Sequence, residues 1–369
     1  MKKKMLWITG IPSPYRVDFF NELGKYYDLQ VLFELKSSDE RDESWKNFKF
    51  DCFEGVFLKG IKTGISSAFS LEVTKYIKNK DIIFVHGNST LTSILSIFYM
   101  KLHKIPYYLE MDGGFAKDGK GIKEKIKKLI IPGAKGYFSS GEISDNYYVT
   151  YGADKDKLIR YPFTSIYNED IINRIPNKED KDKLREKLNI KEKYCVISVG
   201  RFSYLQGYGK GYDTLMRTAE IADKNIGWYI IGDEPTDEFV RWKNDKNLDN
   251  VHFVSFLQKK ELNEYYLAAD LSIILTRGDV WGLVVNEAFS KGLPVISSDK
   301  CAAGLEMIKN DYNGYVIPVD NPEKTKEFVD KILFNEELRK QMSFNCLETI
   351  KEYTIENMAN THIERIKNI

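Results

Sequence analysis

Two acidic side chains in the segment DVWGLVVNEAF, residues 279–289, are of the type that recognises sugar hydroxyls. Asp279 lies in a loop after the apolar run LSIILT, and Glu287 lies within an expected helix. An ionised carboxylate accepts hydrogen bonds at both oxygens, so it holds two neighbouring hydroxyls of a ribose or a hexose. The alternative is that Asp279 belongs to a helix cap and Glu287 is a solvated helix residue.

The expected start of this helix suits an anion. Gly282 falls at the helix N-terminus, where unpaired backbone N–H groups and the positive end of the helix dipole favour a phosphate. We therefore predict that the backbones of Gly282, Leu283 and Val284 contact a diphosphate.

A glycine-rich loop in VISVGRFSYLQGYGKGYD, residues 196–213, offers cations for the same diphosphate. Arg201 follows an expected strand, and Lys210 stands just before an expected helix. Glycines let the backbone approach a pyrophosphate closely, and the two cations neutralise its charge. The spacing matches neither a Walker loop nor the dinucleotide fingerprint, so the loop by itself does not identify a nucleotide.

The elements that must position these residues follow from the rhythm of the chain. Short apolar runs alternate with longer amphipathic stretches: MLWITG, LQVLFEL, DIIFVHG, IPYYLEMD and GYFSSG, then YCVISVG, WYIIGD, VHFVSF, LSIILT, PVISSD and GYVIPV. This alternation predicts parallel strands with crossover helices. We expect an α/β fold of two Rossmann-like doubly wound domains that face each other across a cleft, since ligands bind beyond the carboxyl ends of parallel strands.

Domain boundaries follow from prolines and charge. A linker is expected near residues 163–178, before the charged stretch PNKEDKDKLREKLNIKEK, which is suited only to a solvated helix. The predicted domains are 1–165 on the acceptor side and 166–350 for the donor. A C-terminal helix, 351–369, is predicted to pack back toward the first domain.

Composition narrows the function classes. The chain has 369 residues, enough for two domains, and its 55 basic and 54 acidic side chains give no argument for a nucleic-acid partner. Its four cysteines lack CxxC spacing, so neither a disulfide framework nor a zinc site is predicted. The most apolar internal stretch, residues 91–102, is too short to span a bilayer, and we expect a cytoplasmic protein.

The motifs taken together resemble a known family. V-G-R, K-G, G-D-x-P, V-x-F, W-G-L-V-x-N-E-A and G-x-P-V-I-S-S-D occur in order over roughly residues 195–320. This pattern resembles the second domain of retaining glycosyltransferases of GT-B architecture, family 4, also called group 1. The start of the chain, GIPSPYRVDFFNEL, looks like the variant in transferases that build bacterial surface polysaccharides.

The resemblance implies roles by matching position. Arg201 and Lys210 would contact the donor diphosphate, Glu287 the ribose and Asp279 the transferred sugar, with retention at the anomeric carbon. Two departures stand out: the family usually has Glu at the position of Asp279, and the loop between Arg201 and Lys210 is longer than usual. No cofactor or obligatory metal is implied, and the Asp-x-Asp pairs of this chain lie in lysine-rich connectors instead of following a buried strand.

The first domain offers candidates for the acceptor side, each with a structural alternative. They follow expected strands: Gly10, Tyr15, Arg16, His86 and Asp112. Arg16 suits an acceptor phosphate, although a capping or solvated role fits equally well, and His86 fits a purely structural strand end equally well.

An amphipathic helix at residues 121–131 is a candidate for membrane contact. It places Ile122, Ile126, Leu129 and Ile130 on one face and surrounds them with lysines, of which Lys123, Lys127 and Lys128 are the predicted contacts. Such a helix suits an anionic bilayer surface, and it equally suits packing on its own sheet.

The sequence thus predicts a transferase, peripherally bound at the inner face of the plasma membrane. It would move a sugar from a nucleotide diphosphate donor to a hydroxyl of a lipid-linked oligosaccharide in polysaccharide or capsule synthesis. Among such donors we expect a UDP-linked sugar. The alternatives are a lipid or a small soluble acceptor, or a non-catalytic GT-B protein that binds a sugar nucleotide or a partner.

Overall fold

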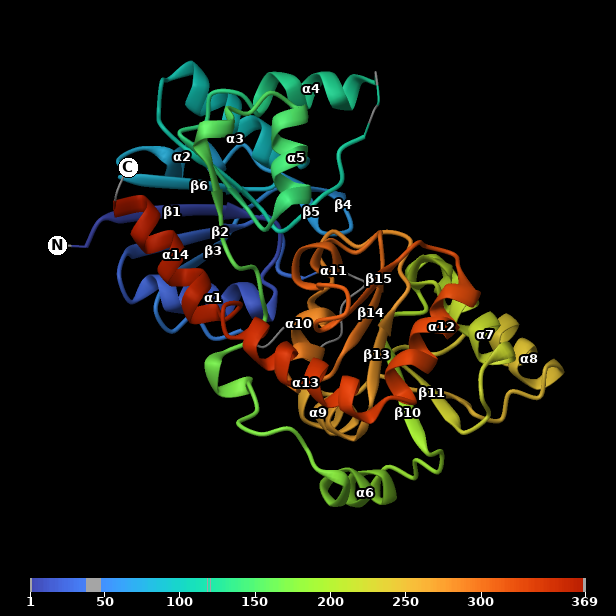
Figure 1. Ribbon diagram of the computed structural model, residues 1–369. Coiled ribbons are helices and arrows are strands. Elements are labelled where there is room, and N and C mark those ends of the chain that lie inside the picture. The colour runs from blue at the N-terminus through green and yellow to red at the C-terminus, as the bar shows by residue number, and fades with distance from the viewer. Residues whose placement is uncertain (1, 38–47, 118, 120, 368–369) are drawn as a thin grey trace. The chain divides into compact units, whose positions relative to one another are not determined.

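The computed structural model describes residues 2–37, 48–117, 119 and 121–367 (Figure 1). The chain divides into two compact units. Unit 1 comprises Met1–Thr164 and Thr354–Ile369, and unit 2 comprises Ser165–Tyr353. From the sequence we expected the first domain to end at residue 165 and the second domain to end at residue 350.

Unit 1 contains a seven-stranded parallel sheet in the order β3-β2-β1-β6-β7-β8-β9. Its strands are β1 (Lys4–Thr9), β2 (Asp28–Phe33), β3 (Glu54–Phe57), β6 (Ile82–His86), β7 (Tyr108–Met111), β8 (Gly136–Ser139) and β9 (Leu158–Arg160). An antiparallel hairpin pairs β4 (Ile61–Gly64) with β5 (Ser67–Phe69). The helices are α1 (Pro14–Gly24), α2 (Val73–Ile77), α3 (Leu91–Leu102), α4 (Ile122–Ile130), α5 (Glu142–Thr150) and α14 (Ile355–Lys367).

Strand β1 shows why this sheet is covered on both faces. From Met5 to Thr9 every residue is buried, as expected for a strand in the middle of a parallel sheet. Trp7 packs edge-on against Phe19 and Phe20 of α1, whereas Leu6 and Ile8 belong to a core shared with α3, α4 and α5. Helices therefore lie on both sides of the sheet (Figure 1).

The C-terminal helix α14 belongs to unit 1. It packs against α1, and its His362 is fully buried. The imidazole stacks on Phe138 with ring centroids 4.6 Å apart, and its Nδ1 lies 2.8 Å from the carbonyl of Met358. A buried aromatic side chain at this position anchors the last helix to the face of the sheet that α1 also covers.

Unit 2 contains a six-stranded parallel sheet in the order β12-β11-β10-β13-β14-β15. Its strands are β10 (Tyr194–Val199), β11 (Ile226–Ile231), β12 (Val251–Val254), β13 (Leu271–Ile274), β14 (Val295–Ser298) and β15 (Gly314–Ile317). Its helices are α6 (Lys178–Lys187), α7 (Tyr212–Ile221), α8 (Asp237–Asp245), α9 (Lys259–Ala268), α10 (Leu283–Ser290), α11 (Ala302–Met307), α12 (Pro322–Leu333) and α13 (Glu336–Ile350).

Every apolar run that predicted a strand forms one, and α6 is the solvated helix expected from its charge, with all residues exposed or half-buried. The short strands β3 and β9 and the hairpin were not predicted. In the part of the chain that the structure describes, no helix is both long and apolar enough to cross a membrane.

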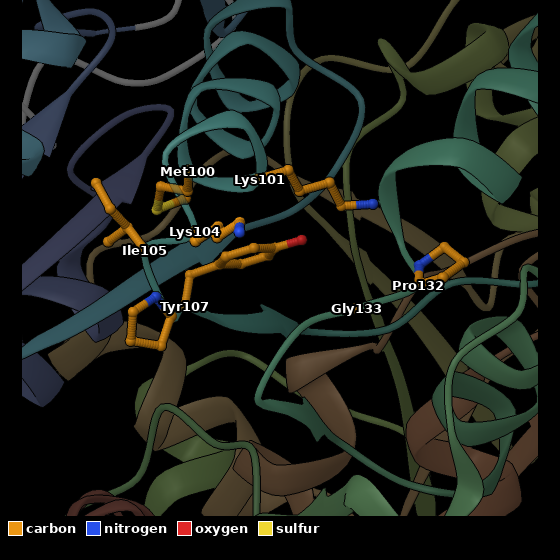
Figure 2. Close-up of a pocket in the computed structure, with 8 residues that line it drawn as sticks. Met100, Lys101, Lys104, Ile105, Tyr107, Pro132 and Gly133 are labelled. Carbon is orange, nitrogen blue, oxygen red and sulfur yellow. The ribbon is translucent and has the colours of Figure 1, made fainter.

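A pocket of about 440 Å³ opens in unit 1 between the C-terminal end of α3, the start of β7 and the turn after α4 (Figure 2). Tyr107, which lines it, directly precedes β7. The pocket is therefore at the amino end of that strand, opposite the carboxyl end where ligand sites of parallel sheets form.

Candidate functional site

The candidate donor site of unit 2 lies where the strand order reverses. Strands β10 and β13 are neighbours, but the chain continues from β10 to β11 on one side and from β13 to β14 on the other. The loops after such a pair diverge and leave a crevice, which is where open parallel sheets bind ligands. One loop holds Arg201 and Lys210, and the other holds Asp279.

Local hydrogen bonds fold the first loop back against the sheet. The backbone N–H groups of Phe202 and Ser203 both donate to the carboxylate of Asp233, which directly follows β11 and Gly232. This explains the G-D-x-P motif: its aspartate fixes the start of the glycine-rich loop. Gly211 has φ 72° and begins α7, and a Cβ there would lie 2.0 Å from the carbonyl oxygen of Leu275. Only glycine permits this close approach of the two loops.

Lys210 and Asp279 are brought into direct contact. The Nζ of Lys210 lies 2.7 Å from Oδ2 of Asp279, and their side chains are 23% and 19% exposed. The backbone of Asp279 is held on both sides, since its N–H donates to the carbonyl of Lys300 and its carbonyl accepts from the N–H of Ala302. The carboxylate therefore stands at a fixed place next to a partly exposed ammonium group.

The start of α10 lies beside this pair. Gly282 is the N-cap residue with φ 101°, and within the described chain no side chain caps the first turn. A Cβ on Gly282 would lie 2.5 Å from Sγ of Cys301 and 3.8 Å from Cγ of Asp279. The first-turn N–H groups of Leu283 and Val284 and the positive end of the helix dipole lie at this end of α10, next to Gly282, where they favour an anion.

Glu287 lies on the same helix, about 7 Å further along its axis. It is half-buried and accepts a hydrogen bond of 3.0 Å from the hydroxyl of Tyr266. Burial raises the pKa of its carboxyl above the ordinary value. Within the described residues, Glu287 forms no hydrogen bond or ion pair with Lys210, which lies in the loop before α7.

Arg277 belongs to this site although the sequence analysis missed it. Its guanidinium donates to both carboxylate oxygens of Asp213 at 2.7 and 2.8 Å, and its Nη2 lies 2.6 Å from Asp320. Its backbone N–H donates to the carbonyl of Gly209. The hydrogen bonds that Arg277 donates to the carboxylate of Asp213 raise the pKa of its guanidinium above the usual range. Arg277 therefore connects the glycine-rich loop to the loop after β13, and the available signal was an arginine directly after the apolar run LSIILT.

Arg201, the other predicted cation, is half-buried and follows Gly200 at the end of β10. The sequence predicted that Arg201 follows a strand, and in the structure it lies at the carboxyl edge of the sheet. The loop that follows is tightly bent, since Leu205 and Gln206 adopt left-handed φ values of 50° and 56°. Non-glycine residues rarely take this conformation, so the loop is strained next to the site.

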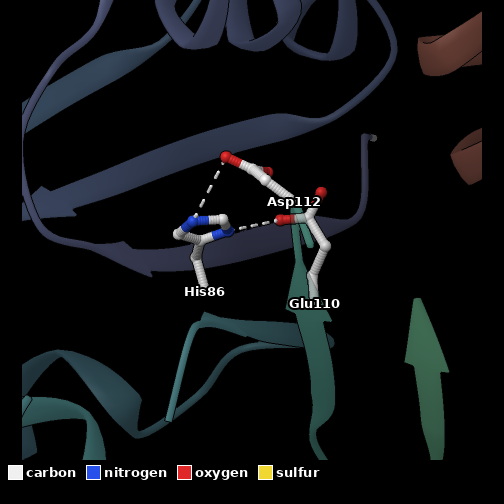
Figure 3. Close-up of side chains that lie close together, drawn as sticks. All are labelled: His86, Glu110 and Asp112. Carbon is white, nitrogen blue, oxygen red and sulfur yellow. Dashed lines mark hydrogen bonds and ion pairs between the residues drawn. The ribbon is translucent and has the colours of Figure 1, made fainter. Parts of the chain in front are cut away.

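The carboxyl edge of the unit 1 sheet carries a buried polar cluster (Figure 3). Arg16 of α1 is 2% exposed, and its guanidinium donates to Glu110 at 2.9 Å and also to Asp112. His86 Nδ1 lies 3.0 Å from Glu110 and 3.1 Å from Arg16. His86 ends β6 and Glu110 lies in β7, so the two side chains come from neighbouring strands.

Charges in this cluster compensate one another. Burial by itself raises the pKa of Glu110, but Arg16 and the neighbouring imidazoles hold that pKa well below its usual range. Burial and the Arg16 charge lower the pKa of His86. Tyr161, from the chain after β9, donates to the carbonyl of Met111 at 2.9 Å and closes the cluster. These contacts therefore hold α1, β6 and β7 together at this edge of the unit 1 sheet.

Arg16 occupies the place that a metal ion would need in this cluster. His86, Glu110 and Asp112 offer ligand atoms within 4.8 Å of one another, the arrangement of a cation site. The guanidinium of Arg16 already supplies the positive charge to both carboxylates. A divalent cation would have to displace it from a buried position, which leaves an uncompensated charge.

The remaining acceptor-side candidates have simpler surroundings. Gly10 follows β1, and a Cβ there would lie 2.9 Å from the carbonyl oxygen of Ser66. Tyr15 is half-buried, and its ring packs edge-on against Phe163 at 5.6 Å. His362 was missed by the sequence analysis; its Nε2 lies 3.5 Å from Glu110, and its distance along the chain hid the connection.

The candidate membrane helix α4 splits its apolar residues between two environments. Ile130 is fully buried, whereas Ile122 and Leu129 are 78% and 59% exposed. Lys123 and Lys128 are exposed. Lys127 is half-buried, with its Nζ 4.6 Å from the ring centroid of Tyr151, so it faces its own unit and not the surrounding solvent.

Comparison with known proteins finds a protein family that matches part of this chain. Residues 180–347 match the family described as glycosyl transferases group 1. A 41.2 kDa protein of the cps region of Klebsiella pneumoniae is 27% identical over 280 residues, covering 73% of this chain and 74% of that protein. The N,N'-diacetylbacillosaminyl-diphospho-undecaprenol alpha-1,3-N-acetylgalactosaminyltransferase of Campylobacter jejuni is 20% identical over 303 residues, with 79% and 78% covered.

Among solved structures, HepE of Anabaena in complex with UDP superposes with a TM-score of 0.79 at 14% identity. The match covers 99% of this chain and 100% of HepE. At this identity the likeness shows the fold, which is GT-B with two Rossmann-like units.

Proposed function

We propose that this chain, whose residues 180–347 belong to the group 1 glycosyl transferases, transfers a sugar from a UDP-linked donor to a hydroxyl of a lipid-linked oligosaccharide. The product would be a bacterial surface polysaccharide or capsule. One observation carries the proposal: Lys210 and Asp279 form a partly exposed pair at the N-terminus of α10, beside the point where the strand order reverses.

The pair suits a donor because its two members can exchange partners. Without donor, Asp279 neutralises Lys210 at 2.7 Å. A donor diphosphate carries more negative charge than one carboxylate and also interacts with the first turn of α10. It would take Asp279's place at Lys210, and the released carboxylate would accept hydrogen bonds from hydroxyls of the sugar.

Other residues then take roles by their positions. Glu287, further along α10, would accept hydrogen bonds from the ribose hydroxyls when ionised. Arg201, at the end of β10, would share the diphosphate charge with Lys210. In this scheme Arg277 contacts neither the ribose nor the diphosphate. It acts by holding the loop that carries Lys210.

In the transfer step, the bond between the anomeric carbon and the diphosphate oxygen breaks, and a bond to the acceptor oxygen forms. The diphosphate leaves with the electron pair, and the acceptor hydroxyl loses its proton to the departing phosphate oxygen. Lys210 and the α10 dipole stabilise the charge that develops on this oxygen. We propose retention at the anomeric carbon, because an acceptor that gives its proton to the departing phosphate oxygen attacks the face from which that oxygen leaves. We also propose no metal requirement, since Lys210 and the α10 dipole supply the positive charge.

The donor and acceptor classes rest on relatives. HepE, which shares the fold, was solved with UDP, and the Campylobacter jejuni relative acts on a diphospho-undecaprenol acceptor. The Klebsiella pneumoniae relative is named for the cps region. A lipid-linked acceptor fits a protein held at the inner face of the plasma membrane. We propose α4 as the contact, through Ile122, Leu129 and the lysines beside them.

A donor panel tests the proposal. UDP-, GDP- and dTDP-sugars are screened by thermal shift and hydrolysis, and the preferred donor is offered with a diphospho-undecaprenol-linked sugar or a short soluble glycan, with and without EDTA. We expect stabilisation by a UDP-sugar, transfer to the lipid-linked acceptor, and an anomeric configuration, read by NMR, that matches the donor. Loss of transfer with EDTA would reject metal independence, and an inverted product would reject retention.

The alternatives give different results in the same assays. Transfer to a simple lipid or the soluble glycan alone would replace the acceptor class but keep the donor site. Donor binding without hydrolysis or transfer to any acceptor would identify a non-catalytic GT-B protein, an outcome that the replacement of the family's usual Glu by Asp279 makes worth testing.

A further inference from the structure

The unit 1 pocket shown in Figure 2 lies apart from the candidate donor site and from the buried polar cluster of Arg16, His86, Glu110 and Asp112. It has a volume of about 440 Å³ and sits at the amino end of β7. Its lining comes from the last turn of α3, the segment leading into β7, and the turn after α4: Met100, Lys101, Lys104, Ile105, Pro106, Tyr107, Pro132 and Gly133. Figure 2 shows the hydroxyl of Tyr107 directed into the space between the lysines and Pro132.

Tyr107 supplies the first indication of a ligand. Its side chain is 2% exposed, and its hydroxyl has no hydrogen-bond partner among the described residues. Burial raises the pKa of this hydroxyl well above its usual value, so it stays protonated and can donate. A buried donor without a partner costs free energy that an acceptor in the pocket recovers.

The two lysines indicate the charge of that acceptor. Lys101 donates one hydrogen bond of 2.6 Å to the carbonyl of Leu129, and an ammonium group has three N–H donors. Lys101 is half-buried, and this burial lowers the pKa of its ammonium group. No acidic side chain occurs among the eight residues that line the pocket. Two ammonium groups and a phenol suit a phosphate.

The surroundings indicate where the phosphate comes from. Leu102, next to Lys101, is 79% exposed, and Leu129, whose carbonyl Lys101 contacts, is 59% exposed. Exposed leucines next to a lysine of the pocket lining, one in sequence and one through its carbonyl, are unfavourable in water but favourable at a bilayer surface, where lysines attract anionic lipid.

We propose that this pocket binds the phosphate of an anionic membrane lipid, with Leu102 and Leu129 entering the acyl region beside it. The proposal deepens the membrane contact put forward above, because it adds a specific headgroup site to an amphipathic helix. Lys101, Lys104 and Tyr107 hold the phosphate, and none of them belongs to the donor site.

Vesicle co-sedimentation tests it with the full chain. Vesicles of phosphatidylcholine alone are compared with vesicles containing phosphatidylglycerol, and we expect binding only to the latter. Tyr107→Phe removes one oxygen without changing charge and should weaken this binding about tenfold, the value of one hydrogen bond to a charged group. Its melting temperature should not fall, since the hydroxyl has no hydrogen-bond partner to lose in the part of the chain that the structure describes. Lys101→Gln with Lys104→Gln should weaken binding about 30-fold.

A matched control separates the pocket from general surface charge. Lys25→Gln removes an exposed lysine at the end of α1, on the other face of the sheet, and should leave binding unchanged. Equal binding by wild type and Tyr107→Phe would overturn the headgroup site. So would titration of glycerol 1-phosphate that matches the vesicle affinity, because the pocket would then bind a soluble phosphate. Donor hydrolysis by the same variants measures the proposed function independently and should stay at the wild-type rate.

Discussion

Replacing Lys210 by Ala separates the proposed catalytic role from a structural one. The side chain is partly exposed, and its ammonium group is paired with Asp279 at 2.7 Å. Pairs with this degree of exposure contribute about 0–1 kcal/mol to the free energy of unfolding. We therefore expect the melting temperature of Lys210→Ala to fall by at most a few degrees.

The same change should have a far larger effect on transfer. Loss of a charged donor to a departing oxyanion costs about 3–4 kcal/mol in the transition state, which lowers kcat/KM by roughly 100- to 1000-fold. UDP affinity should fall less, by about tenfold, because wild type gives up the contact between Lys210 and Asp279 on binding and the variant has none to give up. Asp279→Asn should have the opposite effect on UDP affinity and still reduce transfer.

The assay is steady-state transfer from the preferred UDP-sugar, with UDP affinity by calorimetry and melting temperature by differential scanning fluorimetry. Lys326→Ala is the matched control, because Lys326 forms a comparable pair with Asp330 on α12, at 2.5 Å with exposures of 35% and 26%. It should keep wild-type turnover. Unchanged kcat/KM in Lys210→Ala, or an equal loss in Lys326→Ala, would refute the reasoning.

Three further predictions address other parts of the sites. Burial raises the pKa of the Glu287 carboxyl, and only its ionised form accepts hydrogen bonds from both ribose hydroxyls, so donor affinity should drop as pH falls through that raised pKa. Calorimetry should show that Glu287→Gln binds the donor more weakly than wild type and without this pH dependence. Arg16→Met should lower the stability of unit 1 by about 3–5 kcal/mol in urea unfolding at neutral pH, because it leaves a buried carboxylate unpaired, and the deficit should shrink in acid as that carboxylate protonates. Gly282→Ala should reduce donor binding, since its φ is 101° and the added Cβ meets Sγ of Cys301 at 2.5 Å, whereas Gly278→Ala meets nothing within 4 Å and should bind normally.

The pH dependence of stability has opposite signs at the two carboxyls. The folded-state pKa of Glu110 is depressed, so its contribution to stability is present above its unfolded pKa and is lost as pH falls toward the folded value. The pKa of Glu287 is raised, so its ionisation opposes folding as pH rises. Glu287→Gln should therefore keep or increase the melting temperature at neutral pH while it weakens donor binding.

Much of the fold could be predicted from local pattern. Strands such as β1 and β11 are buried on both faces and read as continuous apolar runs, which makes them visible in the sequence. Strand β9 has only three residues, half-buried or exposed, so no periodicity marks it. Strand β3 is similarly short and never fully buried.

The candidate donor site was only partly predictable. The residue types at Lys210, Asp279 and Gly282 already indicated phosphate and sugar recognition, because backbone N–H groups, a cation and a carboxylate have fixed hydrogen-bonding capacities. Arg277 was missed because its role depends on Asp213 and Asp320, which meet it only in the folded chain. Lys127 was predicted as a membrane contact, but its aromatic neighbours come from α5 and the residue after it, which the helix's own pattern does not contain.

The sequence by itself determined which groups were available and, through the alternation of apolar runs, that parallel strands would gather them at a sheet edge. Tertiary structure alone decided which of them meet. It pairs Lys210 with Asp279 and buries Arg16 between Glu110 and Asp112, and it leaves the Tyr107 hydroxyl without a hydrogen-bond partner among the described residues. The reason is physical: hydrogen-bonding capacity belongs to each side chain, whereas desolvation and charge compensation depend on neighbours that are distant along the chain.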